Sequence, residues 1–257
     1  MTTPDQPWAR RPAIPGLRAL VTTVHAGNLA LHAGADPGGA RAARARLEER
    51  IGRRVLFVSQ IHSPRVVRID RTTDLDAFAA DPPECDALVT ARDDVALAVM
   101  VADCMPIAFA DPDVGVVGAA HAGRRGLLDG VIQNTVAAMT DLGARPERIR
   151  ASVGPSICGR CYEVPADMLE EAVRSNPAAG GETRWGTPAV DLQSGARWAL
   201  EQAGIRDEHM ELPTVCTLED EDFFSHRRSS ASGRFATVVW RDGSAENPDS
   251  ARHAAQR

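Results

Sequence analysis

The chain has 257 residues, of which 44% are hydrophobic and 25% charged, and its formal net charge is −6 at pH 7. This composition is typical of a soluble globular protein, and the negative charge provides no attraction to nucleic acid or to an anionic membrane. No apolar run reaches about 18 residues and the N-terminus lacks a signal-peptide pattern, so we expect a cytoplasmic protein without a membrane span.

The use of lysine and cysteine narrows the chemistry further. All 29 basic residues are arginine, which excludes Schiff-base chemistry, pyridoxal phosphate enzymes and P-loop enzymes. Any bound anion must therefore be held by arginine, histidine or backbone N–H groups. The five cysteines are odd in number and scattered along the chain, which argues against a disulfide framework and for a reducing compartment.

The first third of the chain alternates short apolar runs with one helical pattern. Residues 1–16 are rich in proline and arginine, and we expect a flexible arm there. The segment 71–84 is polar and contains proline, as surface loops do. Between these segments, the pattern predicts strands at 19–24, 55–58 and 66–69 and a helix at 40–51.

Two buried strands are predicted in the centre of the chain, and each ends in polar residues. The run 95–101 leads into Asp103 and Cys104, and the run 114–120 leads into His121 and a glycine-spaced turn. After Gly126 the apolar period changes to three and four residues, which predicts one amphipathic helix that ends at Gly143.

The C-terminal part continues the alternation. It contains a Gly/Pro/Asn-rich segment at 176–188, expected to be a loop, and a polar tail at 242–257, expected to be disordered. We expect residues 17–241 to form one domain. The remaining predicted elements are strands at 149–153, 215–217 and 235–240 and helices at 165–175 and 193–203.

His62, Cys104 and His121 each lie at the end of a predicted strand. One thiolate and two imidazoles form a good ligand set for Zn²⁺, and three protein ligands leave the fourth tetrahedral position for water or substrate. Zinc lowers the pKa of a bound water to ~7. The three residues are far apart in the sequence, so this site is an inference from ligand chemistry, not a match to a local motif.

Other metal sites are less well supported. Cys158 and Cys161 have the spacing of a metal clip, but no second Cys/His pair is near them in the sequence, so packing in a turn is favoured. The H-x-E and P-C-x-x-C signature of zinc nucleobase deaminases is absent. Copper also binds two histidines and a cysteine, and Met105 is adjacent to Cys104. A multicopper oxidase, however, needs more histidines, many of them in H-x-H pairs, whereas this chain has seven histidines and no such pair, so multicopper chemistry is disfavoured and zinc is favoured over copper.

A Cys104/His121 nucleophilic dyad is the main alternative to a metal site. Cysteine hydrolases need a thiolate, a base and a group that orients the base. Asp103 or Gln60 could supply the orienting group. The spacing of these residues does not distinguish a dyad from a metal site.

A series of motifs spans about residues 19–240 and resembles the YfiH-like proteins, a family described as laccase-domain polyphenol oxidases and now regarded as purine nucleoside phosphorylases with adenosine deaminase activity. The motifs are QIHS at 60–63, DALVT at 86–90, ADCMP at 102–106, AHAGRRG at 120–126, GPSICGRCYEVP at 154–165, DL at 191–192, CT at 216–217, FSHRR at 224–228 and GRFA at 233–236. They occur in the family's order.

The resemblance implies an α/β (α+β) fold, a single mixed-sheet layered αββα sandwich of the YfiH/cytotoxic-necrotizing-factor-like type. It implies a zinc ion held by His62, Cys104 and His121. The implied reaction is attack of phosphate on C1′ of adenosine, inosine, guanosine or methylthioadenosine, together with deamination of adenosine. The expected partners are therefore purine nucleosides and phosphate, and we expect a monomer or a weak homo-oligomer.

Four further residues are candidates for roles at such a site. Asp103, beside Cys104, could orient a ligand or move a proton. Gln60 and Arg227 are candidates for substrate or phosphate binding. Arg125 could hold phosphate in a bidentate manner at the start of the predicted helix, where backbone N–H groups favour anions.

The sequence departs from the family pattern at three places. A longer glycine-rich loop is shortened to HAGN at 25–28, Arg124 replaces a tryptophan, and His226 replaces a tyrosine. The shortened loop leaves open a nucleoside-binding protein with weak or no catalysis.

Overall fold

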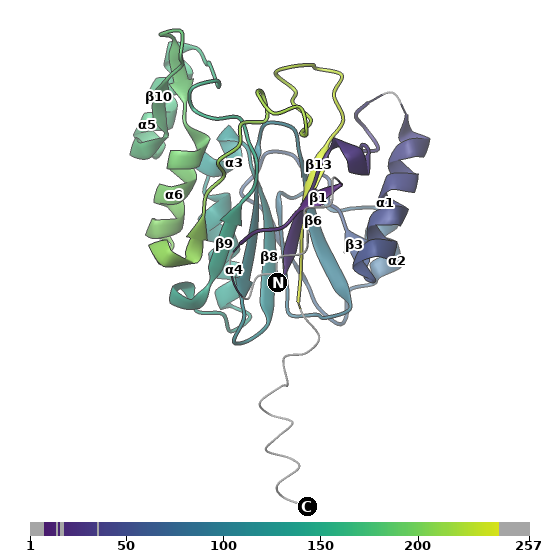
Figure 1. The fold of residues 1–257 in the computed structure, drawn as a ribbon. Coiled ribbons are helices and arrows are strands. Elements are labelled where there is room, and N and C mark those ends of the chain that lie inside the picture. The colour runs from purple at the N-terminus through teal and green to yellow at the C-terminus, as the bar shows by residue number, and fades with distance from the viewer. Residues whose placement is uncertain (1–7, 14, 16–17, 35, 242–257) are drawn as a thin grey trace, which may run out of the picture.

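Two β-sheets lie face to face in the computed structural model, and helices cover both outer faces (Figure 1). The structure describes residues 8–13, 15, 18–34 and 36–241. The five-stranded sheet has the order β1 (Ala9–Arg10), β2 (Ala19–Thr22), β13 (Phe235–Trp240), β6 (Val95–Val101) and β3 (Arg54–Leu56). The six-stranded sheet has the order β12 (Met210–Glu211), β9 (Arg150–Val153), β7 (Met105–Asp111), β8 (Val116–Ala122), β5 (Ala87–Thr90) and β4 (Val66–Ile69).

Both sheets are mixed, and the helices lie in two groups. Strand pairs β3–β6, β4–β5 and β9–β12 are parallel, and the other pairs in these sheets are antiparallel. The α-helices are α1 (Pro37–Ile51), α2 (Leu75–Ala80), α3 (Arg124–Leu128), α4 (Val131–Thr140), α5 (Ala166–Ser175) and α6 (Leu192–Gln202). Helices α1 and α2 lie on the side of the five-stranded sheet and α3 to α6 on the side of the six-stranded sheet (Figure 1). The expected αββα sandwich is therefore confirmed.

Strand β6 shows how the sequence produces the layers. Successive side chains of a strand point to opposite faces, and every residue of β6 is buried. Val95, Leu97 and Val99 enter the core between the two sheets. The alternate residues pack with α1 in a second core. A strand buried on both faces is a continuous apolar run, which is why this element was predicted with its observed bounds.

Several other elements differ from the prediction. The helix predicted after Gly126 is two helices, α3 and α4, separated at Gly130, whose φ of 92° is incompatible with a continuous helix. The strand predicted at 215–217 is wrong, because Cys216 makes only an isolated bridge with Ser156. Strand β7 was not predicted.

Shorter elements fill the segments expected to be loops. Helix α2 lies in the predicted loop 71–84. The predicted loop 176–188 contains β10 (Gly180–Glu182) and the first residue of β11 (Pro188–Val190), with which β10 forms a hairpin. The 3₁₀ helices are η1 (Val24–Ala26), η2 (Pro146–Arg148), η3 (Pro177–Ala179) and η4 (Asp207–His209).

The two chain ends are described only in part. Within the predicted arm 1–16, Ala9 and Arg10 form β1, which pairs with β2, while residues 1–7 lie outside the described residues. The predicted tail 242–257 also lies outside them. Among the residues that the structure describes, no helix has the length and apolar character needed to traverse a bilayer.

Chain crossings between the sheets bring three distant segments to one end of the sandwich. Residues 102–104 carry the chain from β6 in one sheet to β7 in the other. Strand β7 pairs with β8 so that Met105 lies opposite Ala122 and Pro106 opposite His121. The segment after β3 also crosses to the second sheet, where β4 begins, and it contains His62.

Candidate active site

The side chains of His62, Cys104 and His121 meet at this end of the sandwich. The Sγ atom of Cys104 lies 3.8 Å from Nε2 of His62, and the centres of the two imidazole rings are 4.7 Å apart, with the rings nearly perpendicular. One potential ligand atom from each residue lies within 4.8 Å of the other two. These three side chains could therefore hold one metal ion, as their residue types indicated.

The three residues of the triad differ in their exposure to solvent. His62 is exposed, Cys104 is half-buried, and His121 is only 3% exposed. An exposed ligand beside two protected ones leaves a side from which a small molecule can approach.

Asp86 holds two of these residues in place. Its carboxylate is completely buried, and Oδ1 accepts hydrogen bonds from Nδ1 of His121 at 2.8 Å and from the backbone N–H of His62 at 2.9 Å. The other oxygen, Oδ2, accepts from the N–H of Ser63 at 2.6 Å and from its hydroxyl at 2.8 Å. With Nδ1 of His121 donating to Asp86, Nε2 is available to a metal ion.

Asp86 also supports an uncommon backbone conformation. The φ of His62 is 61°, in the left-handed region that side-chain-bearing residues rarely adopt. The hydrogen bonds from His62 and Ser63 to Asp86 hold this turn. Asp86 was seen in the sequence only as part of a motif, because a single aspartate at the start of a strand gives no local sign of such a role.

The charges in the triad favour a thiolate on Cys104 beside a protonated imidazolium ring on His121. Burial alone would raise the pKa of Cys104, but the charge and hydrogen bonds of His121 and His62 outweigh it and lower this pKa to about 6. Burial likewise opposes the charged form of His121, but Cys104 and Asp86 raise its pKa to about 9. A thiolate is the form that acts both as a metal ligand and as a nucleophile.

Gly123 gives the triad room. A Cβ atom at this position would lie 2.7 Å from Cδ2 of His62 and 3.0 Å from Sγ of Cys104. Any side chain at position 123 would therefore displace two of the three potential ligands. Gly123 is also the N-cap of α3, so the turn after β8 approaches the triad directly.

Asp103 is committed to other partners. Its oxygens accept hydrogen bonds from the hydroxyl of Thr217 at 2.7 Å and from the backbone N–H of Arg227 at 2.7 Å. Its own φ is 88°, which allows the sharp crossing between β6 and β7. These contacts tie the turn that carries Cys104 to the segment that carries Arg227.

A cavity of about 470 Å³ opens beside the triad, and all three residues line it. Gln60 and Arg227 also line it, as do Tyr162 and Arg234. The guanidinium carbon of Arg227 lies 4.9 Å from the centre of the Tyr162 ring. Ligand-binding pockets commonly have a volume in this range, so the cavity is large enough to be a small-molecule site.

The candidate phosphate-binding residues are not all at the cavity. Arg125 is exposed and does not line it, and Arg124 forms an ion pair with Glu171 at 2.6 Å. The amide of Gln60 makes two hydrogen bonds of 2.8 Å to the backbone of Met100. Arg227 is the predicted arginine that the structure brings to the cavity.

Arg234 and His32 were missed as cavity residues. Arg234 belongs to one of the quoted motifs, but only the return of β13 past residues 28–34 shows that it lies beside His32. Burial, then the positive charges of Arg234 and Arg44, lower the pKa of His32. This part of the cavity is thus electropositive and suited to an anion.

Comparisons with known proteins agree on the family. The family model described as multi-copper polyphenol oxidoreductase laccase matches residues 20–242. A purine nucleoside phosphorylase of Streptomyces griseus is 46% identical over 218 residues, covering 84% of this chain and 87% of that protein.

Two solved structures are similar to the fold. A protein of Neisseria meningitidis is 35% identical with a TM-score of 0.79, covering 91% of this chain and 98% of that one. The hypothetical protein YfiH of Bacillus licheniformis is 27% identical with a TM-score of 0.80, covering 88% and 93%.

Proposed function

The chain belongs to the multi-copper polyphenol oxidoreductase laccase family, which includes the YfiH-like proteins, and we propose that it is a zinc-dependent purine nucleoside phosphorylase. One observation carries the proposal: two imidazoles and a thiol converge on the wall of a cavity of nucleoside size that also contains two arginines. The name of the Streptomyces griseus relative supports the same activity.

The donor set supports zinc. Zn–N bonds of about 2.1 Å and Zn–S bonds of about 2.3 Å at a tetrahedral angle separate the nitrogen and sulfur ligands by about 3.6 Å. The distance between Cys104 Sγ and His62 Nε2 is 3.8 Å, so little movement is needed. His62, Cys104 and His121 would hold the ion, which supplies Lewis acidity at the cavity.

The remaining residues would bind and orient the reactants. Phosphate attacks C1′ of the nucleoside, so that a C1′–O bond forms, the C1′–N9 bond breaks, and the purine leaves with a proton. Arg227 and Arg234 can hold the phosphate, because guanidinium groups bind phosphate oxygens in a bidentate manner. Tyr162 offers a ring on which a purine can stack.

We include adenosine deamination in the proposal. In this reaction water replaces the amino group at C6, giving inosine and ammonia.

Asp86 would keep His121 in one tautomer and one orientation during both reactions. Its carboxylate is fully buried and accepts a hydrogen bond from Nδ1 of His121.

Product analysis with and without phosphate tests the proposal. Zinc-loaded protein should convert inosine and phosphate into hypoxanthine and ribose 1-phosphate, and should convert adenosine into inosine without phosphate. Chelation should abolish both reactions and Zn²⁺ should restore them. Binding of inosine without any product would instead indicate a nucleoside-binding protein.

A cysteine hydrolase is the second candidate. Cys104 could act as the nucleophile, His121 as the base and Asp86 as the group that orients the base, because His121 contacts both of the other side chains. The orienting group in this arrangement is Asp86, not Asp103 or Gln60 as considered from the sequence. Such an enzyme would be inactivated by alkylation of Cys104 and would be unaffected by chelators. A phosphorylase that needs zinc gives the opposite response to chelation.

A further inference from the structure

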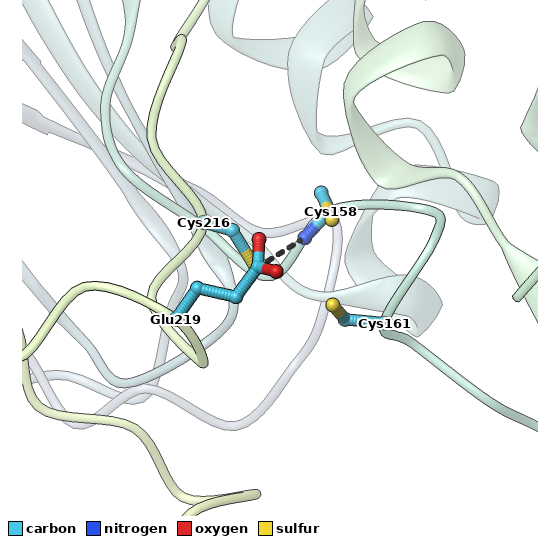
Figure 2. Close-up of side chains that lie close together, drawn as sticks. All are labelled: Cys158, Cys161, Cys216 and Glu219. Atoms are coloured by element: carbon cyan, nitrogen blue, oxygen red, sulfur yellow. Dashed lines mark hydrogen bonds between the residues drawn. The ribbon is translucent and has the colours of Figure 1, made fainter. Parts of the chain in front are cut away.

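A second group of potential ligands lies beside the cavity, formed by Cys158, Cys161, Cys216 and Glu219 (Figure 2). One ligand atom of each lies within 4.8 Å of the others. The sequence offered Cys158 and Cys161 without a second pair. The fold supplies that pair from a distant segment, in which Cys216 and Glu219 repeat the same two-residue spacing.

We propose that this group, the thiolate cluster, binds a second zinc ion, with the three thiolates and the carboxylate of Glu219 as its four ligands.

The chemistry of the donors favours a metal ion over ordinary packing. Thiolates are the preferred ligands of zinc, and four protein ligands are typical of structural zinc sites. Cys161 and Cys216 are 3% and 8% exposed, while Cys158 is half-buried and Glu219 is exposed. Figure 2 shows the four side chains directed toward one another from two separate loops. All three cysteines are free thiols, and three thiols cannot pair completely as disulfides.

Arg184 offsets part of the charge of the cluster. Three thiolates and a carboxylate around a divalent ion leave an excess of two negative charges. The guanidinium of Arg184 contacts both Sγ of Cys161 and a carboxylate oxygen of Glu219. A positive group that bridges two ligands has the position of an outer-shell residue that orients them.

The thiolate cluster joins the two loops that form one wall of the cavity. Ile157 and Tyr162, which line the cavity, flank Cys158 and Cys161 in the sequence. On the other loop, Thr217 follows Cys216 and donates its hydroxyl to Asp103. The backbone N–H of Cys158 lies 3.4 Å from Sγ of Cys216, so the loops already touch. A metal ion here would hold the loop that carries Tyr162 against the loop that carries Thr217, whose hydroxyl donates to Asp103.

Cobalt binding separates this site from the triad. In full-length Cys104→Ala protein the triad has lost its thiol, so thiolate-to-cobalt charge-transfer absorption on adding Co²⁺ must come from other cysteines. We expect that absorption, and we expect Zn²⁺ to displace it. Its absence in folded Cys104→Ala protein overturns the proposal.

Metal content gives a second, independent test. Wild-type protein should contain two zinc ions per chain by elemental analysis. Cys161→Ser and Cys104→Ala should each contain one. Cys85→Ala is the matched control, because Cys85 is buried in the core between the sheets and belongs to neither group. It should contain two. One zinc per wild-type chain, lost with Cys104, overturns the proposal, as does a disulfide among the three cysteines that leaves no second metal.

Discussion

The two cysteine-containing groups differ in the chemistry that surrounds similar thiols. In the triad, two imidazoles lower the pKa of Cys104 to about 6, and a cavity opens beside it. In the thiolate cluster, burial and neighbouring thiols raise the pKa of Cys158 to about 12, and a fourth side chain closes the set. Under the two proposals, the first group would meet a ligand and the second would hold two loops together. This is the difference between catalytic and structural metal sites.

Removing a ligand of the triad should have the largest effect. His121→Ala should lower phosphorolysis by on the order of 10³-fold or more, about 4 kcal/mol of transition-state stabilisation, because the metal ion is lost. Steady-state rates of hypoxanthine release measure this effect. His25→Ala is the control, since His25 is exposed and does not line the active-site cavity. A His121→Ala enzyme within tenfold of wild type would make the triad irrelevant to the reaction.

Asp86→Asn should have the next largest effect. The Asn side chain has one acceptor oxygen and one NH₂ group, so it cannot accept all the hydrogen bonds that the carboxylate now accepts from His62, Ser63 and His121. The orientation of His121 would be lost. Loss of such a partner typically lowers metal affinity by roughly 10–100-fold, which competition with a chromogenic chelator can measure.

Asp111→Asn is the matched control for Asp86→Asn. Asp111 is also fully buried, but it accepts hydrogen bonds from Arg145 and Arg148 at the far end of β7. The Asp111→Asn protein should have a lower thermal stability than wild type and an unchanged metal affinity. Equal metal affinity in both variants would remove Asp86 from the account of the site.

A smaller effect is expected at Tyr162. Stacking of a base on an aromatic ring contributes about 1–3 kcal/mol, so Tyr162→Ala should raise KM for inosine by about tenfold. Tyr162→Phe keeps the ring and should remain near wild type. Initial-rate measurements at varied inosine concentration separate the two variants. A loss with Phe as large as with Ala would mean that the hydroxyl, and not the ring, is required.

The smallest catalytic effect is expected in the thiolate cluster. Cys161→Ser should lower kcat far less than His121→Ala does, because the cluster contacts no reactant and acts only through the loops that carry Tyr162 and Thr217. It should also lower Tm, at roughly 2–4 °C per kcal/mol of lost stability. Calorimetry and kcat on the same preparation give both values. An equal fall in kcat for Cys161→Ser and His121→Ala would contradict the assignment of a catalytic role to the triad and a structural role to the thiolate cluster.

The elements that could be predicted from the sequence were those with a clear pattern in their own residues. Strands β4, β6 and β13 were predicted with their observed bounds because Val- and Ala-rich runs indicate strands directly. Strand β7 was not predicted, because Pro106 near its start and Asp111 at its end shorten its apolar run to residues 107–110. It nevertheless lies buried between β8 and β9. The triad could be inferred from ligand chemistry at strand ends.

Residues that depend on tertiary contacts could not be predicted in the same way. Asp86 reaches the triad from the start of another strand, and Cys216 meets Cys158 only because the fold brings two loops together. Arg125 illustrates the converse: its place at a helix start suggested phosphate binding, but its side chain does not line the cavity. Spacing in the sequence contains no information on these contacts.

A crystal structure of the zinc-loaded protein, with anomalous scattering recorded at the zinc edge, tests the central claim most directly. The account predicts a peak about 2.1 Å from one nitrogen of His62 and one of His121 and about 2.3 Å from Sγ of Cys104, open toward the cavity. Absence of a peak there, with the thiol of Cys104 turned away from both rings, would contradict it.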